Sequence, residues 1–109
     1  MLKLLVGIGN PGIKYSYTRH NIGWELIDKF NSNFDFQVVK NTAEYELWKG
    51  DYNNTELYTM KPLTFVNNSG LPLKKVLKKL NITSDKILIF VDDINLQLGE
   101  IRLKKHGSS

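Results

Sequence analysis

Four polar side chains are of the types that activate water against an acyl group, and they lie in three separate stretches of the chain. His20 can take a proton from water when a carboxylate fixes its tautomer, and Asp92 is the candidate carboxylate. Asn10 and Asn67 are neutral amides that can orient an acyl group or a water without competing as bases. These residue types predict a candidate hydrolytic centre.

Each of these residues also has an ordinary structural explanation. A histidine at the start of a helix, as expected for His20, is more often a cap or a surface residue. Asn10 suits a tight turn. An aspartate at a strand end, such as Asp92, often caps the segment that follows it. Residue types and spacing alone leave the hydrolytic and the structural explanations open.

The elements around these residues should bring them to one edge of a sheet. Leu4–Ile8 is a short apolar run typical of a buried strand, and Gly9–Gly12 stops it with a turn around a proline. Ile87–Val91, the most apolar run in the chain, predicts a central strand that ends in Asp92. Because ligands in open α/β folds sit at the carboxyl ends of the strands, we expect the candidates to meet there.

The remaining segments predict two helices and a mixed sheet. Apolar residues at helical spacing predict a helix of about ten residues from Ile22 and a second helix that includes Leu73 and Leu80. Strands are expected at Phe36–Val39, Ala43–Lys49, Thr55–Lys61 and Glu100–Lys104, with a polar turn at Gly50–Asn54 and a loop at Lys61–Gly70. The hairpin around the polar turn makes the sheet mixed rather than purely parallel.

The composition is that of one small globular domain with an excess of positive charge. The 109 residues have room for one domain, and no apolar run approaches the roughly 20 residues of a membrane helix. Fifteen basic and eleven acidic residues give a net charge of +4, which favours an anionic partner such as nucleic acid. Lys74, Lys75, Lys78 and Lys79 predict a solvated face of the second helix, with contact to phosphates as the alternative.

Two other motifs are present only in part. Gly7–Gly12 matches the G-x-G-x-x-G pattern of dinucleotide-binding proteins, but the helix does not begin inside the motif, where its N-terminus would meet the pyrophosphate. Leu88–Asp93 is similar to a Walker B strand, but the sequence has no phosphate-binding loop of the P-loop type. Asp92, Asp93 and His20 are also possible metal ligands, although nothing in their spacing requires a metal.

Four motifs, in this order, resemble one known family. They are Val6–Gly12 with Tyr15, Thr18–Gly23, Lys61–Gly70, and Asp92–Gly99 leading into Arg102–Lys104. The set is similar to that of the bacterial-type peptidyl-tRNA hydrolases. The resemblance implies a single α/β domain over residues 1–109, with a three-layer α/β/α architecture and a mixed, mostly parallel sheet.

The resemblance also implies a function and roles for particular residues. It implies a cytoplasmic, monomeric hydrolase, not bound to membranes, that cleaves the ester between peptide and tRNA in peptidyl-tRNA and releases the tRNA for reuse. His20 would be the general base, oriented by Asp92, and the substrate would be bound by Asn10, Tyr15 and Asn67. The tRNA phosphates would be met by Lys104, Lys105 and Arg102. No metal or organic cofactor is implied.

The sequence departs from the family pattern in three places. Val66 stands where the family usually has methionine, and Asp93-Ile94-Asn95 replaces the usual Glu-Leu-Asp. The chain stops at Ser109, before the Gly-Gly-His-Asn-Gly segment whose asparagine belongs to the family's active site. We therefore expect an N-terminal portion of a longer hydrolase domain, with open strand edges where further chain would pair.

One alternative function uses the same scaffold. A non-catalytic tRNA- or RNA-binding module would bind tRNA with an affinity that falls steeply with salt, and it would cleave no ester. An assay that separates binding from turnover discriminates between the two.

Overall fold

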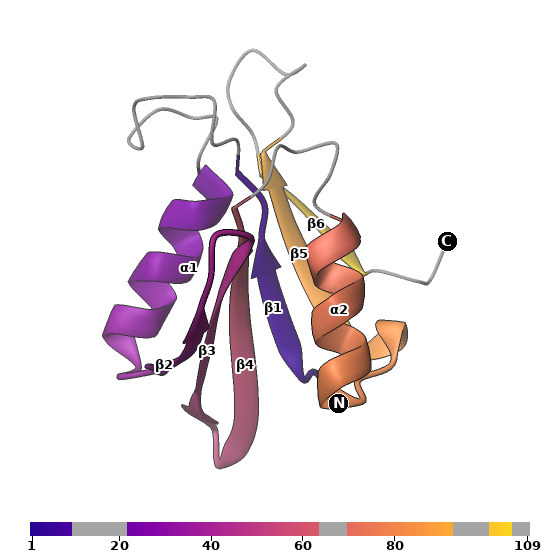
Figure 1. Cartoon of the computed structure of the whole chain (residues 1–109). Helices are drawn as coiled ribbons and strands as arrows, with labels where there is room; N and C mark the ends of the chain where they lie inside the picture. Colours follow the sequence, from indigo (N-terminus) through magenta and orange to yellow (C-terminus); the bar gives the residue numbers. More distant parts are fainter. Residues whose placement is uncertain (10–21, 64–69, 93–100, 106–109) are drawn as a thin grey trace.

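A sheet with a helix on each face makes up the described part of the protein (Figure 1). The computed structural model describes residues 1–9, 22–63 and 70–90 in full, and the backbone alone at 91–92 and 101–105. In chain order the elements are β1 (Leu4–Gly7), α1 (Ile22–Asn33), β2 (Gln37–Asn41), β3 (Tyr45–Tyr52), β4 (Thr55–Pro62), α2 (Gly70–Leu80), a 3₁₀ turn (Ser84–Lys86), β5 (Ile87–Asp92) and β6 (Ile101–Lys105).

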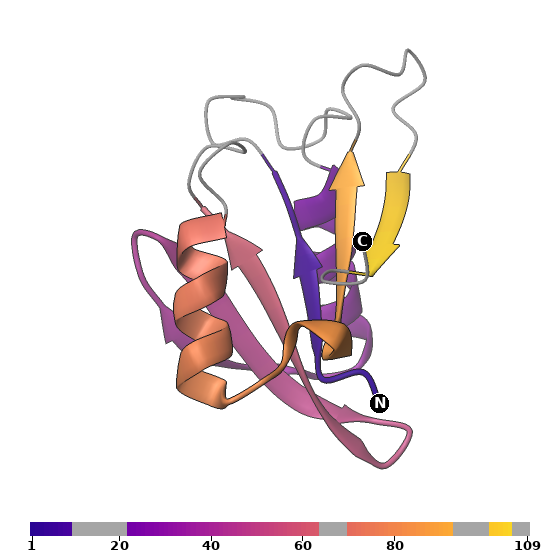
Figure 2. The ribbon, with the colours of Figure 1, turned by 90° about the vertical axis from the view of Figure 1, so that its right-hand side faces the viewer.

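The sheet has the strand order β2-β3-β4-β1-β5-β6, with β1 in its interior. The central strand β1 runs parallel to both of its neighbours, β4 and β5. The outer pairings, β2 with β3, β3 with β4, and β5 with β6, are antiparallel. Figure 2 shows β1 and β5 pointing the same way and β6 running against them. A mixed sheet is confirmed. The expectation that it is mostly parallel is wrong for the described strands, because three of their five pairings are antiparallel and two are parallel.

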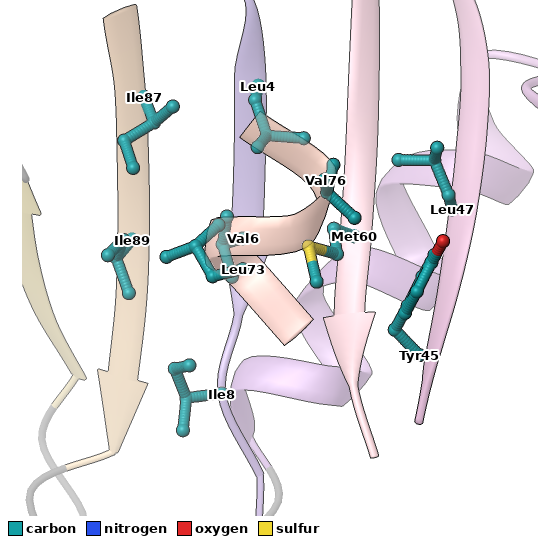
Figure 3. Packing of buried hydrophobic residues seen from close by; sticks show 10 residues of the cluster. All are labelled: Leu4, Val6, Ile8, Tyr45, Leu47, Met60, Leu73, Val76, Ile87 and Ile89. Atoms are coloured by element: carbon teal, nitrogen blue, oxygen red, sulfur yellow. The ribbon is translucent and has the colours of Figure 1, made fainter. Parts of the chain in front are cut away.

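Alternation of side chains along the strands divides the core into two halves. On one face, α2 contributes Leu73 and Val76 to a cluster with side chains from β1, β3, β4 and β5 (Figure 3). On the other face, α1 contributes Ile27, which packs with Leu5 and Leu57. Helices therefore cover both faces, and the predicted three-layer α/β/α arrangement is confirmed.

Both helices present one apolar stripe to the sheet, as the sequence spacing predicts. In α2 the buried residues are Pro72, Leu73 and Val76, and all four of its lysines are exposed, which confirms the predicted solvated face. Two of these lysines, Lys78 and Lys79, lie in the last turn, where positive charge complements the helix dipole. Among the described residues, no helix is long and apolar enough to span a bilayer.

The hairpin between β3 and β4 is tighter than the sequence predicts. Its loop consists of Asn53 and Asn54, which have φ values of 53° and 63°, and Tyr52 pairs with Thr55. Asparagine tolerates this left-handed conformation, which suits a two-residue hairpin. Gly50 lies within β3, in register with Leu57, and the ring of Phe36 leaves no room there for a side chain, since a Cβ at Gly50 would stand 2.4 Å from Phe36 Cδ1.

Candidate functional site

The carboxyl ends of three strands meet at one edge of the sheet. Val6 of β1 is in register with Met60 of β4, and Gly7 of β1 is in register with Phe90 of β5. Because these strands are parallel, β1, β4 and β5 all end at this edge (Figure 2). The described chain stops there at Gly9, before residues 10–21, and at Leu63, before residues 64–69. Open α/β sheets bind their ligands at such an edge.

Two glycines let the start of α1 approach the end of β1 closely. A Cβ on Gly7 would lie 2.2 Å from the carbonyl oxygen of Gly23, and a Cβ on Gly23 would lie 2.3 Å from the carbonyl oxygen of Ile8. Both contacts are with backbone, which cannot move aside as a flexible side chain does. The Ile8 amide donates to the carbonyl of Phe90 at 3.0 Å, so β1 and β5 stay paired beyond Gly7.

The side chain of Trp24 ties the first part of α1 to the end of β4. Its indole Nε1 donates a hydrogen bond to the carbonyl oxygen of Pro62 over 3.0 Å. Gly9 lies against the same ring, since a Cβ at Gly9 would stand 2.4 Å from the indole carbons. The tryptophan therefore contacts the chain leaving β1 and the last residue of β4.

A buried lysine lies at the end of β4. Lys61 is 8% exposed, and its Nζ lies 2.6 Å from Asp28 Oδ1 of α1 and 3.4 Å from Glu46 Oε1 of β3. Burial of an ammonium is unfavourable unless it is paired, and here one cation is held between two carboxylates. Lys61 lies in β4, as the expected strand Thr55–Lys61 requires, but the expectation that the loop includes Pro62 is wrong, because β4 continues to Pro62.

A second polar contact joins α1 to β4 one turn further along the helix. Thr59 Oγ1 donates to Asn31 Oδ1 over 2.6 Å, and both side chains are buried. Within the described part of the chain, Asn31 Nδ2 has no hydrogen-bond partner. Trp24, Asp28 and Asn31 lie on one face of α1, so the helix is fixed to β4 by directional bonds along its length.

Four of the predicted site residues lie outside the described residues. These are Asn10, Tyr15, His20 and Asn67. Their predicted roles, and the predicted contact between His20 and Asp92, stay predictions.

The other predicted site residues are described by backbone only. Asp92 is the last residue of β5, at the edge where β1 and β4 also end, and it is paired with Ile101 of β6. Arg102, Lys104 and Lys105 belong to β6, in register with Val91, Ile89 and Leu88. The possible metal ligands His20 and Asp93 lie outside the described residues. Among the side chains that the structure describes, no three or more acidic, histidine or cysteine groups cluster as a metal site would require.

The structure adds groups at this edge that the sequence reasoning did not single out. Trp24 carries the contact to Pro62, and the Lys61 ammonium is buried between Asp28 and Glu46. An aromatic residue in the first turn of a helix, directly after Gly23, was a usable signal of close packing. The partners of Lys61 carried no such signal, because they are distant in sequence.

Comparison with known proteins identifies the family. The family model for peptidyl-tRNA hydrolase matches residues 4–109. The chain belongs to the peptidyl-tRNA hydrolase family.

Curated peptidyl-tRNA hydrolases match almost the whole of this chain. One from Wolbachia sp. subsp. Drosophila simulans is 39% identical over 108 residues, which are 99% of this chain and 59% of that protein. One from Aster yellows witches'-broom phytoplasma is 41% identical over 106 residues, which are 97% of this chain and 56% of that protein. The chain therefore spans somewhat more than half the length of these relatives.

A solved structure in the same family shares the fold. The crystal structure of peptidyl-tRNA hydrolase from Acinetobacter baumannii superposes with a TM-score of 0.80 at 30% sequence identity. The match covers 94% of this chain and 53% of that one. Both the sequence and the fold therefore place this chain with the peptidyl-tRNA hydrolases.

Proposed function

We propose that this chain carries the hydrolytic centre of a peptidyl-tRNA hydrolase, which cleaves the ester between peptide and tRNA in peptidyl-tRNA. The observation that carries the proposal is the shared edge of β1, β4 and β5 in a member of this family. Three of the four motifs begin within the last residues of these strands. We further propose that residues 1–109 belong to one hydrolase domain, which is a monomer in the cytoplasm.

In the proposed mechanism His20 is the general base. It takes a proton from water, and the resulting hydroxide attacks the ester carbonyl carbon to form a tetrahedral intermediate. Collapse of the intermediate breaks the bond to the tRNA oxygen, which takes the proton back from the imidazolium. The products are a peptide carboxylic acid and a tRNA hydroxyl.

The other residues position these groups. Asp92 accepts the second N–H of the imidazole and stabilises the imidazolium. Asn10 and Asn67 orient the ester through their amides, and Tyr15 helps to shape the cleft. Because water, a base and positioned donors suffice for this step, the proposal needs no metal or organic cofactor.

The β6 cations supply the proposed tRNA contacts. Arg102, Lys104 and Lys105 lie on the strand that pairs with β5, which ends at Asp92. A basic strand next to the ester would neutralise phosphates near the tRNA 3′ end. Such contacts position the substrate and carry little sequence information.

The test is hydrolysis of an N-blocked aminoacyl-tRNA by the 109-residue chain. His20→Ala should lower turnover about 10²–10⁴-fold, which is the usual contribution of a general base. His106→Ala is the matched control, since the sequence has two histidines, and it should retain turnover. Equal turnover in both variants would contradict the mechanism. Salt-sensitive tRNA binding without turnover, in this chain and also in a version extended to the length of the relatives, would instead support the non-catalytic RNA-binding module.

A further inference from the structure

A second candidate site lies between α2 and the β2–β3 edge of the sheet. A pocket of about 240 Å³ opens there, with apolar walls from all three elements. The wall residues are Val39, Leu47, Val76 and Leu80. Lys40 of β2 and Lys79 of the last turn of α2 also line it, together with Tyr45 of β3. None of the described lining residues is acidic.

An irregularity in β2 turns Lys40 toward this pocket. Val38 is in register with Trp48, whereas Lys40 is in register with Leu47, so the pairing shifts by one residue between them. Leu47 belongs to the α2 face of the core and Trp48 packs on the α1 face. Residues that pair directly share a face, so Val38 and Lys40 lie on opposite faces despite their spacing of two. Without the bulge, Lys40 would lie on the α1 face.

The two lysines of the pocket interact with each other. A hydrogen bond with Lys79 is the main cause that raises the pKa of Lys40, and the nearby Tyr45 phenol raises it further. The same contact lowers the pKa of Lys79. Both lysines line one pocket whose described lining has no acidic residue, so an anion bound between them would offset the repulsion of two like charges.

Glu44, which directly precedes Tyr45 of the pocket, is already paired. Glu44 Oε1 lies 2.9 Å from Lys75 Nζ, one turn of α2 before Lys79. Of these two α2 lysines, Lys75 pairs with a carboxylate, whereas Lys79 lines the pocket together with Lys40. The second arrangement is the one that gains from an external anion.

We propose that the pocket between Lys40 and Lys79 binds a phosphate group of an RNA backbone. Lysine ammonium groups are common phosphate ligands, and the apolar walls can take the adjoining ribose or base. Tyr45 lines the same pocket. The choice of RNA as the source of the phosphate rests on the proposed function. The pocket adjoins the last turn of α2, away from the edge where β1, β4 and β5 end, so it adds a contact separate from the hydrolytic centre.

The first test compares two double variants of equal charge. Lys40→Gln/Lys79→Gln removes the pocket pair, and Lys74→Gln/Lys78→Gln removes two exposed lysines of the same helix that do not line the pocket. Fluorescence anisotropy with a labelled single-stranded RNA oligonucleotide measures affinity at several salt concentrations. The pocket variant should bind roughly tenfold more weakly, with a salt slope smaller by about 0.7, which corresponds to one neutralised phosphate on a single strand.

Three results would overturn the inference. Equal losses in the two double variants would mean that the α2 face attracts RNA by general charge, with no role for the pocket. Unchanged binding in the pocket variant would mean that there is no phosphate site there. Inorganic phosphate that shifts the NMR signals of both lysines, while RNA leaves them unchanged, would assign the pocket to a free phosphate.

This test does not depend on catalysis. The oligonucleotide carries no aminoacyl ester, so its binding can succeed in a chain that hydrolyses nothing. Conversely, normal turnover together with unchanged RNA binding in the pocket variant would overturn this inference and leave the proposed function in place.

Discussion

The sheet face under α2 is packed almost entirely with hydrocarbon, whereas the face under α1 has polar groups built into its interior. On the α2 side the buried cluster contains ten residues, and the Tyr45 hydroxyl is its one polar side-chain group among the described members. On the α1 side the apolar cluster is smaller, and beside it lie the Lys61 ion pairs and the contact between Asn31 and Thr59.

The two faces contribute differently: the face under α2 mainly stabilises the sheet, and the face under α1 mainly positions its helix. Hydrophobic burial is non-directional, so the α2 face stabilises the sheet without specifying where the helix must sit to within a fraction of an ångström. Hydrogen bonds and ion pairs are directional. Those of the α1 face hold α1 against the ends of β1 and β4, where residues 10–21 and 64–69 leave the described chain. The polar face is therefore the one next to the proposed hydrolytic centre.

The largest effect is expected from a cavity under α2. Met60 is fully buried in the apolar cluster, so Met60→Ala should lower the free energy of unfolding by about 2–5 kcal/mol. Met60→Leu conserves most of the volume and should cost less than about 1.5 kcal/mol. Urea unfolding measures both. Similar losses for the two variants would show that this face is not closely packed.

A smaller loss is expected from removal of the cation under α1. Lys61→Met keeps the unbranched stem of the side chain but leaves Asp28 and Glu46 without their shared partner. Breaking a fully buried pair costs about 3–5 kcal/mol, and because Asp28 is 56% exposed we expect about 1–3 kcal/mol. A double-mutant cycle with Asp28→Asn gives the coupling. Additive losses would contradict the direct interaction.

The contact between Thr59 and Asn31 should contribute less again. Thr59→Val is close in shape but removes the donor to Asn31 Oδ1, which should lower the free energy of unfolding by about 1–2 kcal/mol. The double variant Thr59→Val/Asn31→Leu removes both polar partners and should be more stable than Thr59→Val alone. Thermal unfolding distinguishes the two. A double variant less stable than Thr59→Val would show that the hydrogen bond is not what holds this site.

The smallest effect is expected at the exposed end of the α2 face. Lys49 Nζ lies 3.0 Å from Glu56 Oε2, and the hydrogen bond with Glu56 raises the pKa of Lys49 above its ordinary 10.5. A raised pKa contributes stability below pH 10.5, and that contribution is lost as the pH rises through the folded value. Lys49→Met should leave the melting temperature at pH 7 unchanged within error in high salt. A clear decrease there would contradict the view that exposed pairs contribute little.

Local sequence patterns predict most of the helices and strands. Tertiary contacts explain where the observed elements differ from the predicted ones. Helical spacing predicts α1 and α2, and apolar runs predict β1 and β5, because each signal lies within one element. The end of β3 was missed because Gly50 reads as a turn residue until Phe36 is seen to pack over it. Lys61 was expected at the end of a strand, but its burial between Asp28 and Glu46 could not be predicted, because these partners are distant in sequence.

The candidate site shows the same division. The strand ends could be predicted, since β5 does end at Asp92 on the edge shared with β1 and β4, whereas the roles of the candidate residues stay predictions. The bulge that turns Lys40 to the α2 face had no local signal, because Phe36–Val39 reads as an ordinary strand. Its effect depends on the register against β3, which is a property of the folded sheet.

The most direct test of the central claim is whether His20 and Asp92 meet at this edge. NMR titration of the two histidines measures their contact without requiring turnover. If the Asp92 carboxylate accepts the imidazole N–H, the pKa of His20 should fall in Asp92→Asn, because the carboxylate stabilises the charged ring. His106 serves as the internal reference and should not change. A His20 pKa that is the same in both proteins would contradict the proposed hydrolytic centre.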